Sequence, residues 1–335
     1  MATTLGIGTE KGGFILSHGS AGWTVSDPLF TGWKVTAWGR TPSGGYLCGL
    51  GSNWFGTSIH RSPDLETWEQ IVPGPEHHRD LEQIWTFHTA GSRIYTGVAQ
   101  AGVFASDDDG VSWSPITALN EFPGNEAWAP GLGGLAAHRI VTAGDRLWVA
   151  ISAVGVFRSA GAAFVRCDDG ISGTVDPSED AAAGYCVHSI VASSPQSMWR
   201  QDHSGVYRSR NGGDSWERTE NGLPAAFGFP ILRDAASGRL FVVPLESDEN
   251  RLPVGGRFGA YLSEDDGDTW RLAGTGWPDE PTYTAVLRGA ADTDGNGSVY
   301  LGTTGGNVWA SHDSGDNWAA LPFTGPRILS LKVLD

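Results

Sequence analysis

Residues 104–113 read FASDDDGVSW, residues 261–270 read YLSEDDGDTW and residues 309–318 read WASHDSGDNW. Each stretch leads from an aromatic residue through serine, an acidic turn and glycine to tryptophan. In such a stretch the serine hydroxyl and the aspartate carboxylate can accept hydrogen bonds from backbone N–H groups within a hairpin turn. Glycine allows the positive φ of the turn, and tryptophan packs back into the sheet. The pattern therefore predicts β-hairpins whose carboxylates are structural. These carboxylates are Asp108, Asp265 and Asp313.

The same pattern occurs seven times along the chain. YRSRNGGDSW ends at Trp216 and HRSPDLETW ends at Trp68, while the weaker copies LSHGSAGW and FRSAGAAF end at Trp23 and Phe164. Successive terminal aromatic residues lie 45 to 54 residues apart. A period of about 40 to 50 residues with several strands per repeat is typical of β-propeller blades. The spacing therefore predicts an all-β, seven-bladed β-propeller that forms a single domain over residues 1–335.

Each blade is expected to hold four antiparallel strands, with the motif between the third and the fourth. The N-terminal segment, TTLGIGT followed by GGFILS, has a motif but no innermost strand before it. The C-terminal segment, RILSLKVLD, has a strand but no motif after it. We therefore expect the C-terminal strand to complete the N-terminal blade, which removes two exposed sheet edges.

Charge and cysteine content exclude several classes of protein. The formal net charge is −16, so a duplex or an anionic membrane is a poor partner. The three cysteines are odd in number and show no CxxC spacing, which indicates neither a disulfide framework nor a thiolate metal site. The N-terminus lacks the features of a signal peptide, and no apolar run approaches the roughly 18 residues that span a bilayer. We expect a cytoplasmic protein.

The repeats resemble those of the BNR, or Asp-box, propellers, a group that includes sialidases, sortilin-type receptor domains, xyloglucan hydrolases and photosystem II assembly factors. Runs such as EAWAPGLGGLAAHRIV and QDHSGVYRS are similar to bacterial members often labelled sialidase or glycosyl hydrolase. The resemblance implies the fold, whereas function depends on the site. Sialidases are expected to carry an N-terminal Arg-Ile-Pro and a three-arginine clamp. Here no arginine precedes Arg40, and Arg327-Ile328 lacks the proline, so no sialidase catalytic residue is carried over.

The two ends of the propeller are expected to differ. Successive connections within a blade alternate between its two ends. The motif turns, which join the third and fourth strands, therefore lie at the same end as the short connections between the first and second strands, and we call this end the turn end. Longer segments fall at the other end, the loop end. They are residues 73–83, 120–134, 167–184 and 244–259. Because binding and catalytic residues concentrate on long loops carried by a rigid scaffold, we expect the functional site at the loop end.

Histidines point to a metal at the loop end. Aligning the blades by their second strands gives Trp85, His138 and His188 equivalent positions, with looser matches at Lys34, Pro230, Tyr283 and Arg327. His203 follows in the next loop. Three imidazoles suit Zn, Cu or Fe with one position open for water or substrate. We therefore predict a transition metal at His138, His188 and His203. The alternative is that each histidine donates to a carbonyl in a polar channel.

Three functions remain open on this scaffold. The first is an enzyme that acts on a small molecule with this metal, and the second is a glycoside hydrolase or lyase that uses carboxylates on a carbohydrate. The third is a non-catalytic binding scaffold, for which a flat apolar surface is expected. The candidate catalytic residues are Glu246, Asp202 and Arg251. The candidate ligand-binding residues are Trp85, Trp128, Glu126, Tyr283, Arg288 and Arg327.

Overall fold

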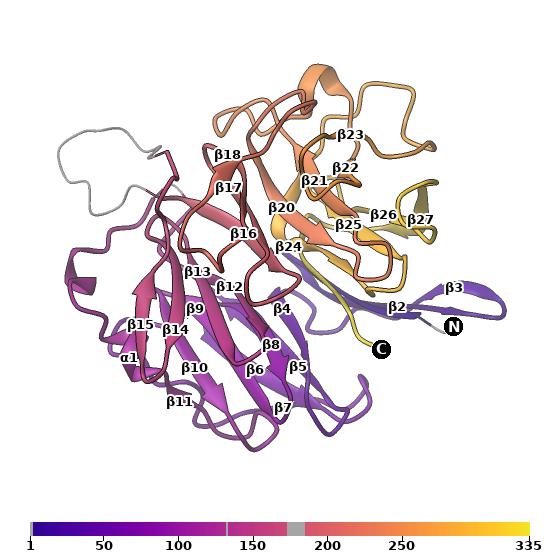
Figure 1. Ribbon diagram of the computed structural model, residues 1–335. Coiled ribbons are helices and arrows are strands. Elements are labelled where there is room, and N and C mark those ends of the chain that lie inside the picture. The colour runs from indigo at the N-terminus through magenta and orange to yellow at the C-terminus, as the bar shows by residue number, and fades with distance from the viewer. Residues whose placement is uncertain (1–2, 132, 173–184) are drawn as a thin grey trace.

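The computed structural model describes residues 3–131, 133–172 and 185–335, and its regular secondary structure is almost wholly short strands (Figure 1). The predicted loop 167–184 therefore lies partly outside the described residues. Among these residues the strands form five four-stranded antiparallel sheets and one eight-stranded sheet. No helix in the described part of the chain is long and apolar enough to cross a membrane.

The four-stranded sheets follow one another along the chain. The first contains β4 (Lys34–Arg40), β5 (Tyr46–Ser52), β6 (Gly56–Ser62) and β7 (Glu69–Gln70). The second contains β8 (Gln83–Ala90), β9 (Arg93–Ala99), β10 (Gly102–Ser106) and β11 (Ser114–Pro115). The third contains β12 (Ala137–Ala143), β13 (Arg146–Ile151), β14 (Gly155–Ala160) and β15 (Ala163–Arg166). The fourth contains β16 (Val187–Ala192), β17 (Met198–Asp202), β18 (Gly205–Ser209) and β19 (Glu217–Arg218). The fifth contains β20 (Gly228–Arg233), β21 (Leu240–Pro244), β22 (Tyr261–Ser263) and β23 (Arg271–Leu272).

The eight-stranded sheet has two antiparallel halves. One half contains β24 (Val286–Thr293), β25 (Val299–Thr303), β26 (Asn307–Ser311) and β27 (Ala319–Thr324). The other contains β28 (Ile328–Val333), β1 (Thr3–Thr9), β2 (Gly12–Gly19) and β3 (Gly22–Val25). A single parallel bridge between Gly289 of β24 and Ser330 of β28 joins the halves. The short helical turns are α1 (Thr117–Asn120), η1 (Asn125–Ala127) and η2 (Val254–Gly256).

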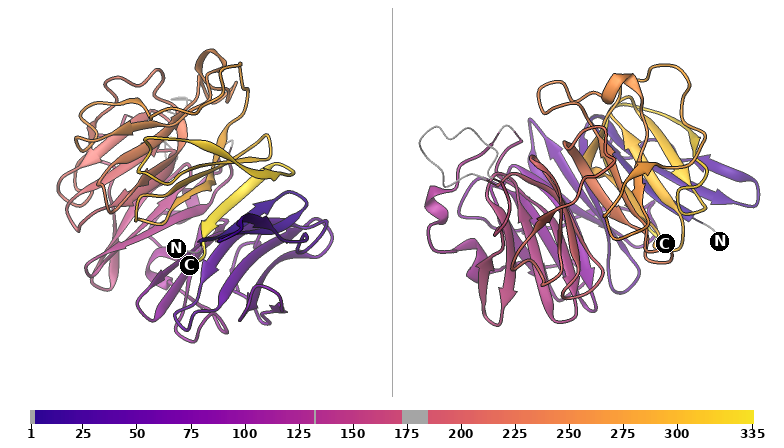
Figure 2. Two further views of the ribbon diagram at one scale, coloured as in Figure 1. Left: turned by 90° about the vertical axis from the view of Figure 1, so that its right-hand side faces the viewer. Right: turned by 45° about the horizontal axis from the view of Figure 1, so that its top comes forward.

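The innermost strands surround a common centre. They contact one another in the closed order β4, β8, β12, β16, β20, β24, β28 and back to β4. The C-terminal β28 pairs antiparallel with the N-terminal β1, and the Thr4 amide donates to Asp335 Oδ1 at 2.8 Å. The two ends of the chain consequently lie side by side (Figure 2). This is the arrangement of a β-propeller.

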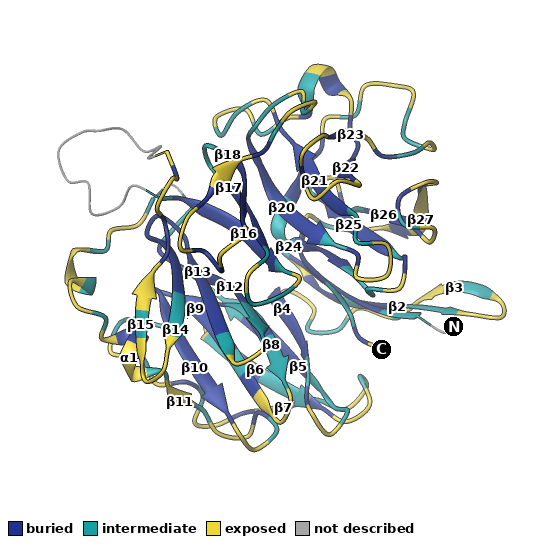
Figure 3. Ribbon diagram, viewed as in Figure 1, coloured by how far each residue is buried: buried dark blue, intermediate teal, exposed yellow. Residues whose placement is uncertain are grey.

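The hydrophobic core lies between neighbouring sheets, and the inner strands are the most buried (Figure 3). In one cluster Val103 of the second sheet packs with Ile140, Val149 and Phe157 of the third. Side chains on a strand alternate between its two faces, so each sheet can present apolar residues to both neighbours. This packing holds the innermost strands in place around the centre.

The motif turns have the predicted hydrogen bonds. Ser263 Oγ donates to Asp265 Oδ1 at 2.7 Å, Gly267 N donates to Ser263 Oγ at 2.8 Å, and Thr269 N donates to Asp265 Oδ1 at 2.9 Å. Trp270 returns into the core and is 4% exposed. Equivalent bonds occur in the turns that contain Asp108, Asp313 and Asn211. The structural role predicted for the turn carboxylates is confirmed.

Candidate functional site

The innermost strands carry β-bulges near the loop end. Trp85 in β8, His138 in β12 and His188 in β16 each lie where the register with the next strand shifts by one residue. The predicted equivalence of these three positions is therefore confirmed. The looser matches at Lys34 and Tyr283 are displaced, because the corresponding shifts fall at Thr36 and within residues 287–290, whereas Pro230 lies within the shift at residues 229–230. Bulges redirect side chains and are common beside functional sites.

Two of the predicted histidines meet a cysteine at the loop end of the fourth sheet. One potential ligand atom from each of Cys186, His188 and His203 lies within 4.8 Å of the others. Cys186 Sγ is 3.5 Å from His188 Nε2. Cys186 comes immediately before β16 and His203 immediately after β17, and the His203 amide donates to the Cys186 carbonyl at 2.9 Å. Strand pairing therefore fixes the relative positions of these residues.

Neighbouring oxygen atoms orient both imidazoles of this cluster. His188 Nδ1 donates to the Gly228 carbonyl at 2.6 Å, which leaves the lone pair on Nε2 facing Cys186. His203 Nε2 lies 3.6 Å from Asp248 Oδ2. Metal-binding histidines usually have their second nitrogen held in this way by a carbonyl or carboxylate. Phe227 and Phe229 pack against the His188 ring at centroid distances of 5.3 and 4.9 Å.

The surroundings of the cluster shift the pKa values of its thiol and of both imidazoles. Burial alone would raise the pKa of the Cys186 thiol, but the hydrogen bond with His203 and the charge of Arg288 outweigh it and lower the pKa. The same hydrogen bond with Cys186 raises the pKa of His203. Burial, followed by the nearby Arg288, holds the pKa of His188 well below its usual value. Thiolate and neutral imidazole are the forms that bind transition metals.

His138 lies outside this cluster. Its Nε2 donates to the Val187 carbonyl at 3.0 Å, and its buried Nδ1 has no hydrogen-bond partner among the described residues. Its ring lies near Trp85, with 6.2 Å between centroids. His188 makes the equivalent bond to the next sheet through Nδ1 instead, which directs Nε2 toward Cys186. The carbonyl-donor alternative therefore describes His138, and Cys186 takes its place beside His188 and His203.

A cavity of about 260 Å³ opens at the loop end of the centre, next to the cluster. Phe229 separates the two: its ring packs on His188 on one side and lines the cavity on the other. Arg288 also lines the cavity and lies close enough to hydrogen-bond Cys186. Of the predicted ligand-binding and catalytic residues, four line this cavity. They are Trp85, Arg251, Arg288 and Arg327.

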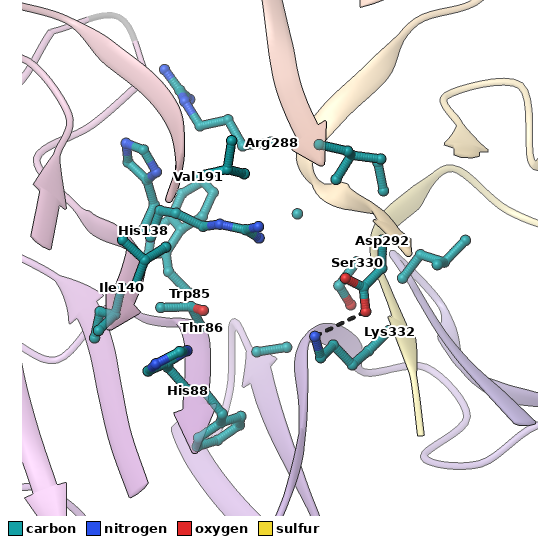
Figure 4. Close-up of a pocket in the computed structure, with 18 of the residues that line it drawn as sticks. Trp85, Thr86, His88, His138, Ile140, Val191, Arg288, Asp292, Ser330 and Lys332 are labelled. Atoms are coloured by element: carbon teal, nitrogen blue, oxygen red, sulfur yellow. Dashed lines mark ion pairs between the residues drawn. The ribbon is translucent and has the colours of Figure 1, made fainter. Parts of the chain in front are cut away.

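A second cavity of about 300 Å³ continues toward the turn end (Figure 4). Trp85 and Arg288 line both cavities, so these two side chains lie where the cavities meet. At its far end, His88 Nε2 is 2.8 Å from Thr142 Oγ1, and Lys332 pairs with Asp292 at 2.9 Å. Figure 4 shows His138 and His88 on one side of this space and Asp292 and Lys332 on the other.

Several candidate residues lie elsewhere. Asp202 is fully buried and pairs with Arg200, whose Nη1 also bonds Asp168 at 2.7 Å. Burial raises the pKa of Asp202, and Arg200 opposes that effect. Its ion pair makes this carboxylate part of a buried network. The exposed Glu246 accepts a hydrogen bond from the Gly255 amide at 3.3 Å and so braces its own loop.

Three predicted ligand-binding residues line neither of the two cavities. Trp128 packs on Phe157 at 5.2 Å between centroids, as part of the core. Glu126 is exposed in η1, and Tyr283 precedes β24 and is 66% exposed. Sequence spacing does not reveal which side chains of a long loop line the centre.

Cys186 was missed by the search for paired cysteine motifs. A different signal identifies it, because Cys186 stands two residues before His188 and residues two apart on a strand share a face. The sequence CVH at 186–188, followed by DH at 202–203 across the hairpin, places a thiol and two imidazoles at one end of a strand pair.

Comparisons with known proteins establish the fold. No protein-family profile and no curated protein sequence matches the chain. A putative 6-phosphogluconolactonase from Bacteroides uniformis ATCC 8492 is similar, with a TM-score of 0.61 at 13% identity over 99% of each chain. The WD40 β-propeller domain of Doa1 gives a TM-score of 0.59 at 11% identity, covering 89% of this chain and 86% of that one. An ancestral GH74 enzyme gives 0.54 at 16% identity, covering 84% of this chain and 37% of that one. The chain is a β-propeller, and identities this low show the fold alone.

Proposed function

We propose that the protein is a seven-bladed propeller of the Asp-box type that holds a transition metal at Cys186, His188 and His203 and hydrolyses a small molecule at its loop end. Counting the halves of the eight-stranded sheet separately gives seven sheets, in agreement with the seven motif copies. The convergence of three potential ligand atoms within 4.8 Å is the observation that carries the function.

The residues of the cluster suit a catalytic metal better than a closed structural site. Structural zinc sites are usually closed by four protein ligands, whereas catalytic sites use three and leave a position open. Only three ligand atoms converge here among the described residues. The His203 side chain is 26% exposed, so the cluster reaches solvent. A bound metal would supply Lewis acidity and an activated water.

Hydrolysis of an ester or lactone is the reaction that we propose first. Among the similar propellers, one is named as a putative lactonase and another as a GH74 enzyme, which supports a hydrolase. In this reaction Asp248 would hold the His203 ring, and Phe227 and Phe229 would limit water around the ligands. Arg288, between the cavity and Cys186, would orient the polarised carbonyl group of the substrate.

The same residues favour a second candidate, in which Cys186 itself is the nucleophile. Its pKa is lowered, His203 is hydrogen-bonded to it, and Asp248 follows His203. A thiol, a base and an orienting carboxylate in this order are typical of covalent catalysis. The glycosidase alternative has weaker support. The only carboxylate among the described residues lining the loop-end cavity is Glu10, whereas that mechanism needs a facing pair.

Metal analysis of tag-free protein tests the proposal. We expect stoichiometric Zn, Cu or Fe in the wild-type protein and in His78→Ala, an exposed control. We expect loss of metal in His188→Ala and His203→Ala. His138→Asn should keep the metal, and if it loses metal while His203→Ala keeps it, the ligand set is wrong.

A hydrolysis assay separates the two candidates. Opening of δ-gluconolactone can be followed by proton release before and after treatment with a chelator. Activity that disappears with the chelator and returns with Zn²⁺ supports the metal enzyme. Activity that survives the chelator but is abolished by iodoacetamide supports the thiol nucleophile. A wild-type protein that binds none of the three metals after their addition contradicts the metal proposal.

A further inference from the structure

The centre of the propeller is cationic although the protein is strongly acidic. The loop-end cavity is lined by four cations and one carboxylate. The cations are Lys34, Arg251, Arg288 and Arg327, and the carboxylate is Glu10. The turn-end cavity adds three more cations and one carboxylate. They are Arg139, Arg233, Lys332 and Asp292. With a formal net charge of −16 for the whole chain, this separation of charge is large. A cleft lined by one sign of charge concentrates ions of the opposite sign.

The arginines of the loop-end cavity are not neutralised by protein carboxylates. Among the described residues, neither Arg251 nor Arg288 forms an ion pair, and the buried Arg288 Nε has no hydrogen-bond partner. Arg327 approaches a carboxylate only at 3.9 Å, from Glu10. By contrast, Arg239 at the turn end pairs with both Glu264 and Asp316. Cations left without carboxylates in a cavity indicate an external anion.

Two of these arginines are held in place around one ring. The Arg251 and Arg288 guanidinium groups lie 5.4 and 5.2 Å from the centroid of Phe229. Arg251 Nε donates to the Asp248 carbonyl at 2.9 Å, and Arg251 has φ of +50°, in the left-handed region. A residue other than glycine adopts this conformation at a cost and does so mainly where the surroundings enforce it. The guanidinium groups are therefore positioned in advance of any ligand.

One loop connects the arginines to the metal cluster. Asp248 faces His203, and Arg251, three residues later, lines the cavity. Phe229 separates Arg251 from His188, and Arg288 lies beside Cys186. Phe229 and Arg288 therefore lie between the cavity and the cluster, so an anionic group bound in the cavity would lie next to the cluster.

We infer that the loop-end cavity binds the phosphate group of a small phosphate monoester, held by Arg251, Arg288, Arg327 and Lys34. A tetrahedral dianion can accept hydrogen bonds from several guanidinium groups at once, whereas a carboxylate monoanion leaves most of a net charge of about +3 unbalanced. A volume of about 260 Å³ suits a small metabolite. The inference rests on the proposed function for the reaction, but the phosphate site can be tested without it.

Binding of inorganic phosphate to the protein as purified, measured by calorimetry, tests this inference. Arg251→Met and Arg327→Met should each weaken binding about tenfold, as expected for loss of a charged hydrogen bond. Arg271→Met, at an exposed arginine of the turn end, is the matched control and should leave binding unchanged. Metal content and thermal melting show whether each variant is folded and loaded.

Glu10→Gln gives a test in the opposite direction. Removing the only carboxylate found among the cavity's described lining residues should strengthen phosphate binding about threefold or more, a gain that misfolding does not produce. Unchanged affinity in both arginine variants overturns the inference. Phosphate binding that is lost in His203→Ala but kept in the arginine variants assigns the anion to the metal, which overturns the inference and leaves the proposed function standing. Acetate that binds more tightly than phosphate overturns the choice of a phosphate group.

Discussion

The turn end and the loop end of this propeller use their charged side chains in opposite ways. At the turn end, each motif carboxylate is fully engaged by its own hairpin, as Asp265 is by Ser263 and Thr269. At the loop end, Arg251 and Arg288 have no carboxylate partner among the described residues. The buried His138 Nδ1 has no hydrogen-bond partner among them. Polar groups that the protein satisfies internally stabilise the fold, whereas buried groups left unsatisfied indicate a site for something else. The difference supports our proposal of a functional site at the loop end.

The largest expected effect concerns buried charge near the loop end. Arg200→Met would leave the buried Asp202 without its cation and Asp168 with Arg166 alone, and breaking a buried ion pair typically costs about 3–5 kcal/mol of unfolding free energy. Urea denaturation measures this loss. Arg271→Met, which breaks the exposed pair with Glu264, should cost less than about 1 kcal/mol. Equal losses of unfolding free energy in the two variants would contradict the expected difference between the buried ion pairs of Arg200 and the exposed pair of Arg271.

The next effect tests whether the loop end holds a metal. Asp248→Asn removes the charge that faces His203 Nε2 at 3.6 Å. Loss of such an orienting partner typically weakens metal binding about 10- to 100-fold. Competition with a fluorescent chelator measures the Zn²⁺ affinity. Glu246→Gln, on the same loop but away from the cluster, provides the matched variant, and an equal loss there would show that the loop and not the carboxylate is responsible.

A pH effect should arise in the turn-end cavity. Burial, with the nearby Arg139 and Lys332, lowers the pKa of His88 to about 4. The unfolded chain, whose histidine has a pKa near about 6.5, therefore takes up a proton first as the pH falls. The contribution of His88 to stability is complete above about pH 6.5 and falls toward pH 4, by roughly 2 kcal/mol between pH 7 and pH 5.

The variant His88→Gln isolates this contribution. Its unfolding free energy should fall less between pH 7 and pH 5 than that of the wild-type protein, and the exposed control His78→Gln should behave like wild type. If the unfolding free energies of the wild-type protein and His88→Gln change in parallel with pH, His88 takes up its proton at the same pH in the folded and unfolded states, which contradicts the prediction.

The smallest effect is expected at a single motif turn. Asp265→Ala removes the acceptor for the Thr269 amide and should cost about 1 kcal/mol of unfolding free energy without changing metal content. Asp265→Asn should restore most of the loss, because Asn211 makes the equivalent bonds in its own turn. A loss of metal in Asp265→Ala would mean that the two ends are not independent.

Sequence alone predicts much more of the fold than of the site, for a physical reason. The motif turns are local, since their hydrogen bonds join residues four or fewer apart, and the seven copies could be found by spacing. The equivalence of Trp85, His138 and His188 could also be found, because the bulges recur at one place in each innermost strand. Which nitrogen of a bulged histidine bonds the next sheet depends on tertiary packing, so the absence of His138 from the cluster could not be predicted, whereas Cys186 could have been found from its place two residues before His188.

The residues that line the loop-end cavity were predicted only in part, for a similar reason. Arg288 and Arg327 stand at or beside innermost strands, and the position of a strand follows from the repeat. Trp128 and Tyr283 lie in long connections, where the path of the backbone is not set by the repeat. The blade number and the sialidase-like resemblance describe a scaffold, and neither specifies the chemistry.

The bulges have a consequence for how such a protein can change. A bulged residue is left out of strand pairing, so its side chain can be exchanged with little penalty to the ladder on either side. Trp85, His138 and His188 thus hold equivalent positions around one axis. One of these positions carries an indole, and the other two carry imidazoles. Substitutions at these three positions could change the ligand specificity of the protein without altering the motif hairpins that stabilise its fold.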